Sequence, residues 1–162
     1  MKTQSMSKML IVSATLLLSL ISCKKEEIEP EKTNQEFYAC HVTNDWDEAS
    51  VKTHLLGTWN WKHKVCPFNP NDIPTDTEHS GLTAKFNSDN TLTILQDSNP
   101  VLTTNWEVIQ TETNILSDPA RSYQIKTDLF VSQLFGVILI CEDEVLFTSS
   151  YVDGCDNRFE KQ

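Results

Sequence analysis

The sequence has little glycine, and it lacks the short motifs through which many enzymes bind phosphate or activate a nucleophile. Only four of its 162 residues are glycine. None of them belongs to a phosphate-binding loop or to the Gly-x-Ser-x-Gly turn of serine hydrolases, and there is no His-Glu-x-x-His pattern. We therefore expect no enzymatic activity and no cofactor.

Cysteine pairs of the zinc-binding type are also missing. Cys40, Cys66, Cys141 and Cys155 are far apart in the sequence, and none has the Cys-x-x-Cys spacing typical of structural zinc sites. His41 follows Cys40, and we interpret it as an exposed histidine rather than a metal ligand. The sequence predicts no metal site.

Long apolar runs are limited to one segment near the N-terminus. The residues from Met9 to Ile21 carry no charge and follow Lys2 and Lys8, which is the layout of a signal peptide. The run is shorter than the roughly 20 apolar residues that a transmembrane helix needs. A signal peptide over residues 1–22 is therefore favoured over a permanent span.

The end of this segment, Leu20-Ile21-Ser22-Cys23, resembles the lipobox of bacterial lipoproteins. The resemblance implies cleavage before Cys23, lipidation of Cys23 and attachment to a membrane through several fatty chains, which together hold firmly. The following Lys24 to Glu27 are similar to the charged signal that sends some lipoproteins to the outer face of the outer membrane. We expect a lipid-anchored protein of the cell envelope, in the outer membrane and facing the periplasm or the surface.

Positive charge is scarce in the expected mature chain. Removal of residues 1–22 leaves 11 basic against 23 acidic residues, a net charge near −12. Such a surface repels nucleic acid, so no nucleic-acid partner is expected. Residues 23–36 are mostly charged or polar, which predicts a tether between the lipidated cysteine and one domain at residues 37–162.

This domain is predicted to be all-β, with one short helix before its strands. Asn44 or Asp45 can cap a helix that ends near Leu56, with Val51 and Leu55 on one face. From Gly57 onward, apolar and polar residues alternate in twos between turn residues, as in short antiparallel strands. The expected strands are Thr58–Val65, Leu82–Phe86, Leu92–Ile94, Val101–Ile109, Ser122–Thr127, Val137–Cys141, Val145–Ser149 and Asn157–Lys161.

Eight strands in a meander favour closure into an up-and-down antiparallel barrel, because closure removes the edges that an open sheet exposes. Leu56-Gly57-Thr58-Trp59, after a short helix, resembles the Gly-x-Trp signature of lipocalins. The resemblance implies a small lipocalin-like barrel in which Trp59 plugs the closed end and a basic residue of the last strand stacks on it. Lys161 fits that role better than Arg158, so Gly57, Trp59 and Lys161 form the expected signature.

The four cysteines that remain after Cys23 is assigned to lipid indicate two disulfides in an exported domain. In an up-and-down barrel, odd strands run toward the open rim and even strands return. Cys66 and Cys155 then meet at the rim, whereas Cys141 falls at the closed end near Cys40. We prefer the pairs Cys66–Cys155 and Cys40–Cys141, with Cys141–Cys155 as the alternative.

The barrel interior and its rim are the candidate ligand site. Inward side chains could form an apolar pocket with a few polar handles, suited to a small hydrophobic ligand. The segment Pro67–Gly81 resembles the first loop that can lid a lipocalin cavity. The alternative is a packed barrel that acts as a protein or glycan interaction module of the envelope. The candidate ligand-binding residues are Trp61, His63, Phe86, Trp106, Tyr123 and Phe147.

Overall fold

A computed structural model describes residues 32–66, 79–112 and 122–162. The expected signal peptide, Cys23, the tether up to residue 31 and residues 67–78 of the expected lid loop lie outside the described residues. Lys32–Gln162 form one compact unit.

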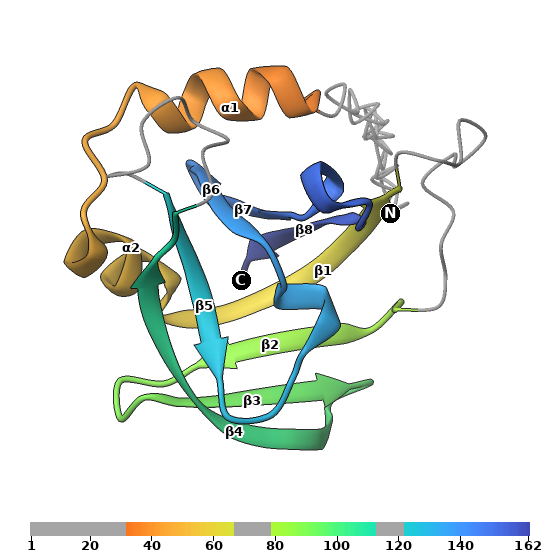
Figure 1. Cartoon of the computed structure of the whole chain (residues 1–162). Coiled ribbons are helices and arrows are strands. Elements are labelled where there is room, and N and C mark those ends of the chain that lie inside the picture. Colours follow the sequence, from red (N-terminus) through yellow and green to blue (C-terminus); the bar gives the residue numbers. More distant parts are fainter. Residues whose placement is uncertain (1–31, 67–78, 113–121) are drawn as a thin grey trace, which may run out of the picture. The chain divides into compact units, whose positions relative to one another are not determined.

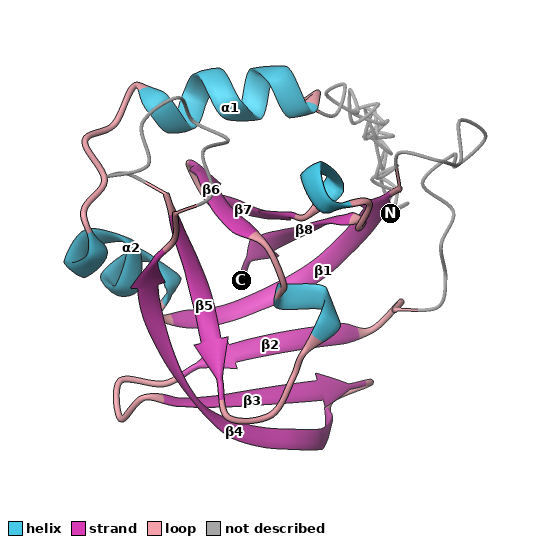
Figure 2. Ribbon diagram, in the orientation of Figure 1, coloured by secondary structure: helices cyan, strands magenta, loops and turns pink. Residues whose placement is uncertain are grey.

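Eight antiparallel strands form a closed barrel in which neighbours in the sequence are neighbours in the sheet (Figures 1 and 2). The last strand pairs with the first, with Trp59 opposite Lys161 and Val65 opposite Asp156. This confirms the predicted small eight-stranded antiparallel up-and-down barrel. The strands are β1 (Gly57–Val65), β2 (Leu82–Phe86), β3 (Thr91–Gln96), β4 (Asn99–Gln110), β5 (Tyr123–Thr127), β6 (Val137–Cys141), β7 (Glu144–Thr148) and β8 (Asp156–Lys161).

Strand β1 shows why the alternation in the sequence produces a barrel wall. Trp59, Trp61 and His63 are buried, whereas Lys62 between them is exposed, because successive side chains of a strand point to opposite faces. The strand begins at Gly57, whose φ of +119° lies in a region that favours glycine. The Gly-x-Trp pattern therefore combines a backbone requirement with an inward aromatic side chain.

The predicted helix is confirmed as α2 (Glu48–Leu55), which precedes β1. Its cap is Asp47 rather than Asn44 or Asp45: Asp47 Oδ1 accepts the Ser50 N–H at 2.7 Å, and Ser50 Oγ accepts the Asp47 N–H at 2.8 Å. This reciprocal capping satisfies two backbone donors at the start of the helix. Val51 and Leu55 are buried in the barrel core.

A second helix, α1 (Asn34–Val42), precedes α2 and was not predicted. It begins at a capping box of Thr33 and Glu36. It packs against the outer face of β6, where Phe37 joins a cluster with Val137, Leu139, Cys141 and Leu146. Every residue of β6 is buried, because α1 covers one face and the core covers the other.

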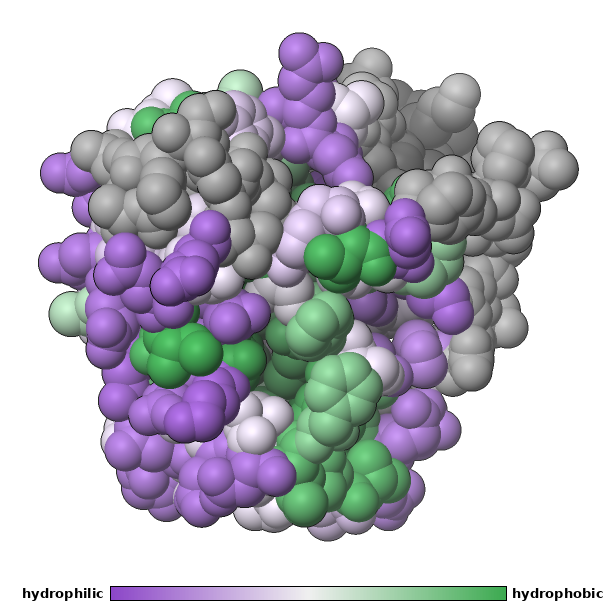
Figure 3. All heavy atoms as spheres, viewed as in Figure 1, coloured by the Kyte–Doolittle hydropathy of each residue, from purple (hydrophilic) through white to green (hydrophobic). Residues whose placement is uncertain are grey.

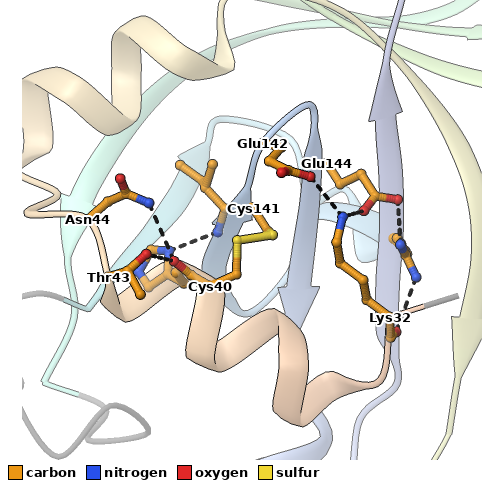
Figure 4. Close-up of a disulfide and its surroundings, with 10 residues drawn as sticks. Lys32, Cys40, Thr43, Asn44, Cys141, Glu142 and Glu144 are labelled. Carbon is orange, nitrogen blue, oxygen red and sulfur yellow. Dashed lines mark hydrogen bonds and ion pairs between the residues drawn. A yellow bond between two sulfur atoms is a disulfide. The ribbon is translucent and has the colours of Figure 1, made fainter.

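Ion pairs and a disulfide hold α1 against the sheet (Figure 4). Lys32 lies 3.1 Å from Glu142 and 2.9 Å from Glu144, and the Arg158 guanidinium also pairs with Glu144. Cys40 of α1 is bonded to Cys141 of β6. The start of the compact unit is thereby fixed to β6, β7 and β8.

His41 of α1 is buried, with 2% of its surface exposed, so the interpretation of an exposed histidine was wrong. Its Nδ1 accepts the Ile140 N–H at 2.8 Å. Strands β5 and β6 share only the register pair Gln124 and Val137 in the described sheet. His41 therefore satisfies a backbone donor of β6 at the place where the ladder between the two strands is short.

The connection between β7 and β8 is organised around Asp156, which is 2% exposed. Its Oδ1 accepts the Ser149 and Ser150 N–H groups, both at 2.9 Å. It also accepts the Thr148 hydroxyl at 2.8 Å, and Asn34 of α1 donates to its Oδ2 at 2.8 Å. A single buried carboxylate thus fixes the turn that carries Cys155.

Candidate functional site

The two ends of β1 define two ends of the barrel. Gly57, at its start, pairs with Phe86, so the turn between β2 and β3 lies at this end. Val65, at its end, pairs with Asp156, so the connection between β7 and β8 lies at the other. We call these the closed end and the rim, and each carries a pocket.

The closed end contains the signature residues in contact. The Lys161 ammonium lies 5.1 Å from the centroid of the Trp59 ring and donates to the His54 carbonyl at 2.8 Å. The indole N–H of Trp59 donates to the Leu55 carbonyl at 2.7 Å. Arg158, the weaker candidate for this role, lies instead on the outer face, 5.4 Å from the Phe37 ring.

The closed end also holds a histidine whose titration the structure perturbs. The pKa of His54 is lowered by burial and then by the nearby Lys161 ammonium, which disfavour the imidazolium. The His54 ring packs on Trp59 at 5.8 Å and on Trp46 at 5.3 Å between ring centroids. These contacts serve to close the barrel end around Trp59.

The two disulfides lie where the strand order places them. Cys66 is bonded to Cys155 at the rim, and Cys40 is bonded to Cys141 beside the turn between β6 and β7. Cys141 is not bonded to Cys155, the alternative considered from the sequence. Disulfides of this kind are typical of oxidising compartments, which indicates that the domain lies outside the cytosol.

The candidate ligand-binding residues of the interior are buried against one another. Phe86 and Trp106 pack edge to face at 4.9 Å, and Phe147 packs in the same way on Phe159 at 5.6 Å. Of the six candidates, only His63 lies outside the apolar core cluster, although it is buried as well. The structure therefore places these side chains in a packed core.

A pocket of about 270 Å³ lies at the rim, and we call it the rim pocket. Phe130 and Phe135 belong to the connection between β5 and β6 and are strongly exposed. The centroids of their rings lie 5.8 Å apart. The space-filling view shows apolar side chains gathered over this connection (Figure 3). The lining includes Lys64, His79, Phe130, Gln133, Phe135 and Asn157.

The rim pocket borders one of the predicted interior residues. The Trp61 ring lies 5.4 Å from the His79 ring, edge to face, and its N–H donates to Asn157 Oδ1 at 3.1 Å. His79 Nε2 is 3.2 Å from Gln133 Nε2. The exposed Phe130 and Phe135 were not among the predicted site residues, because a strand pattern does not describe the connection that carries them.

A second pocket, of about 410 Å³, lies at the closed end, and we call it the closed-end pocket. Its residues come from α2, the turn between β2 and β3, strand β4, and the end of β5 together with the residue that follows it. Only Trp106 among them was a predicted site residue. The lining includes Lys52, Asp89, Asn90, Trp106, Glu107 and Asp128.

Two further properties concern only the described part of the chain. Residues 32–66, 79–112 and 122–162 contain no group of three histidine, cysteine, aspartate or glutamate side chains that could hold a metal ion. Within the same residues, no helix has both the length and the apolar character that a membrane span requires.

No protein-family model matches the chain, and no curated protein matches it. Among solved structures, the fold is similar to the crystal structure of a DUF4847 family protein from Bacteroides vulgatus ATCC 8482, with 12% sequence identity and a TM-score of 0.43. The match covers 67% of this chain and 96% of that chain. Function is therefore inferred from this chain's own residues.

Proposed function

We propose that the chain is an exported lipoprotein, anchored through Cys23, whose barrel binds a small apolar ligand at its rim. The observation that carries the ligand proposal is the rim pocket with its two exposed phenylalanines. The packed interior favours a ligand at the rim rather than one enclosed among the inner aromatic side chains.

The proposal of an anchor is supported by the lipobox-like Leu20-Ile21-Ser22-Cys23 and by the two disulfides. Cells that express the full chain are expected to incorporate labelled palmitate into it, because the fatty chains attach to Cys23. The Cys23→Ala variant is expected to remain unlabelled. Equal labelling of both forms would contradict lipidation at this residue.

Large apolar side chains rarely stand exposed side by side without a reason. Phe130 is 74% exposed and Phe135 is 44% exposed, and the neighbouring Leu129 is exposed as well. Exposed apolar patches with polar surroundings are characteristic of binding sites. Here the polar surroundings include Gln133 and Asn157, so the site suits a ligand with an apolar body and a polar end.

The rim site is tested by titration with N-phenyl-1-naphthylamine, a neutral apolar fluorophore. We expect saturable binding with quenching of tryptophan emission, because the Trp61 ring packs against His79, which lines the pocket. In the double variant Phe130→Ser, Phe135→Ser the dissociation constant should rise at least about tenfold, because the apolar contact of both rings is lost.

Val101→Ser is the matched control for this titration. Val101 is also strongly exposed, but it belongs to β4 and not to the rim pocket. The Val101→Ser variant should bind the fluorophore with the same affinity as the unchanged chain. Binding that is absent in the unchanged chain, or equal in the double variant, would rule out the rim as the ligand site.

A further inference from the structure

We propose that the closed-end pocket is a second binding site and that it takes a neutral carbohydrate. This inference goes beyond the rim site and does not depend on it, because the two pockets share no described lining residue. Its basis is a polar cavity of about 410 Å³, a volume within the range of small-molecule sites.

The walls of the closed-end pocket are held in place by their own hydrogen bonds. Asp89 accepts the N–H of Thr91 at 3.0 Å and its hydroxyl at 2.6 Å. Asn105 donates to Asp128 at 2.7 Å, and the Trp106 N–H of the main chain donates to the Asn90 carbonyl at 2.9 Å. Ordering the site on binding therefore costs little, since these groups are already fixed.

Trp106 links the pocket to the barrel core. The residue is 2% exposed, and its ring packs edge to face with Phe86 on the interior side. The Lys52 ammonium of α2 lies over the same ring, 5.8 Å from its centroid. A change at the pocket is therefore reported directly by this indole group.

The indole N–H of Trp106 has no hydrogen-bond partner in the described structure. A buried tryptophan N–H usually finds one, and Trp59 and Trp61 both do. Trp46, whose N–H also lacks a partner, does not line the pocket. An unsatisfied buried donor is costly. This N–H is closed to solvent, so the indole ring must shift slightly on binding before an oxygen acceptor of a bound molecule can satisfy it.

The charges around the pocket favour a neutral ligand with hydroxyl groups. An anion would meet the carboxylates of Asp89, Glu107 and Asp128, and a cation would meet Lys52 and Lys126. Hydroxyl groups can donate to the carboxylates and accept from the amide, ammonium and indole N–H groups. Neutral sugars carry several such hydroxyls on one rigid ring.

The inference is tested by NMR titration of the purified protein, labelled with ¹⁵N at the tryptophan indoles, with lactose and with cellobiose. We expect saturable movement of the Trp106 indole signal with at least one of the two sugars, while the Trp59 signal stays in place. The Trp106→Phe variant assigns the signal. Glucuronate and glucosamine carry charge on the same type of ring, and they should bind more weakly than the neutral sugars.

Two variants decide whether the pocket is responsible. Asp128→Asn should weaken sugar binding about tenfold, because a hydrogen bond to a charged group is replaced by a neutral one. Asp153→Asn is the matched control, since Asp153 is exposed outside both pockets and should leave the titration unchanged. The absence of any Trp106 movement with either sugar, or equal binding by Asp128→Asn, would overturn the inference.

Discussion

The double variant Cys40→Ser, Cys141→Ser is expected to lose about 4 kcal/mol of unfolding free energy. The disulfide joins residues that are 101 positions apart, and the stabilisation grows with the length of the loop that a crosslink closes. The measurement is urea unfolding followed by tryptophan fluorescence. If the unfolding free energy of the variant lies within about 1 kcal/mol of that of the unchanged chain, this entropic account is contradicted.

The Cys66→Ser, Cys155→Ser variant is the matched control, because its crosslink spans a similar 89 positions. Both variants should lose comparable global stability, but only the first should release α1. The Ile140 amide reports this release through hydrogen exchange, since its N–H is bonded to His41 of α1. Equal protection of Ile140 in the two variants would show that α1 stays docked without its crosslink.

Helix α1 depends on this crosslink because its apolar contact is small. Phe37 is its only fully buried apolar side chain, and most of its other residues are exposed. Lys32 and Arg158 bind Glu144 at the helix start, and Asn34 binds Asp156. The helix is thus held by a few specific bonds rather than by an extended apolar face.

The first strands of the barrel were predictable because they are buried on one side. In β1 and β2, inward residues such as Trp59, Ala84 and Phe86 alternate with more exposed ones. That alternation gives the direction of each side chain. The closure was inferred separately, because an open meander of eight strands would leave exposed edges. The observed ends of several strands differ from the expected ends by one or two residues, as hydrogen bonding at strand ends is not encoded in the alternation.

Helix α1 was not predicted because its own pattern is weak, and the expected tether covered its first residues. Two signals in the sequence did point to it. Thr33 and Glu36 have the spacing of a capping box. The unbroken apolar run Val137–Cys141 requires cover on both faces, and only a segment outside the meander could supply the second cover.

The candidate site was less predictable than the fold. Periodicity showed that Trp61, Phe86 and Trp106 point inward, but it gives no interior volume, and the structure packs them into the core. Phe130 and Asp128 sit where β5 ends, and their grouping with residues of other elements depends on the closed barrel. Pockets formed by several connections become visible only in three dimensions.

Acidification from about pH 7 to pH 5 is expected to cost the domain about 2 kcal/mol through His41 alone. Burial lowers the pKa of His41 from 6.5 to about 4. Between these two values the unfolded chain binds a proton that the folded chain does not. Stability is therefore complete above the unfolded value and falls as the pH decreases toward the folded value.

The structure gives this proton a specific target. The His41 Nδ1 lone pair accepts the Ile140 N–H, and the ring stacks on Trp46 at 6.0 Å, so the imidazolium form loses the bond and meets an apolar surround. His41→Gln keeps an acceptor and does not titrate, so urea unfolding at both pH values should show most of the loss removed. The pKa of His54 is also lowered. The His54→Gln variant therefore measures the contribution of His54 to the acid sensitivity separately from that of His41. An unchanged pH dependence in His41→Gln would assign the acid sensitivity to other groups.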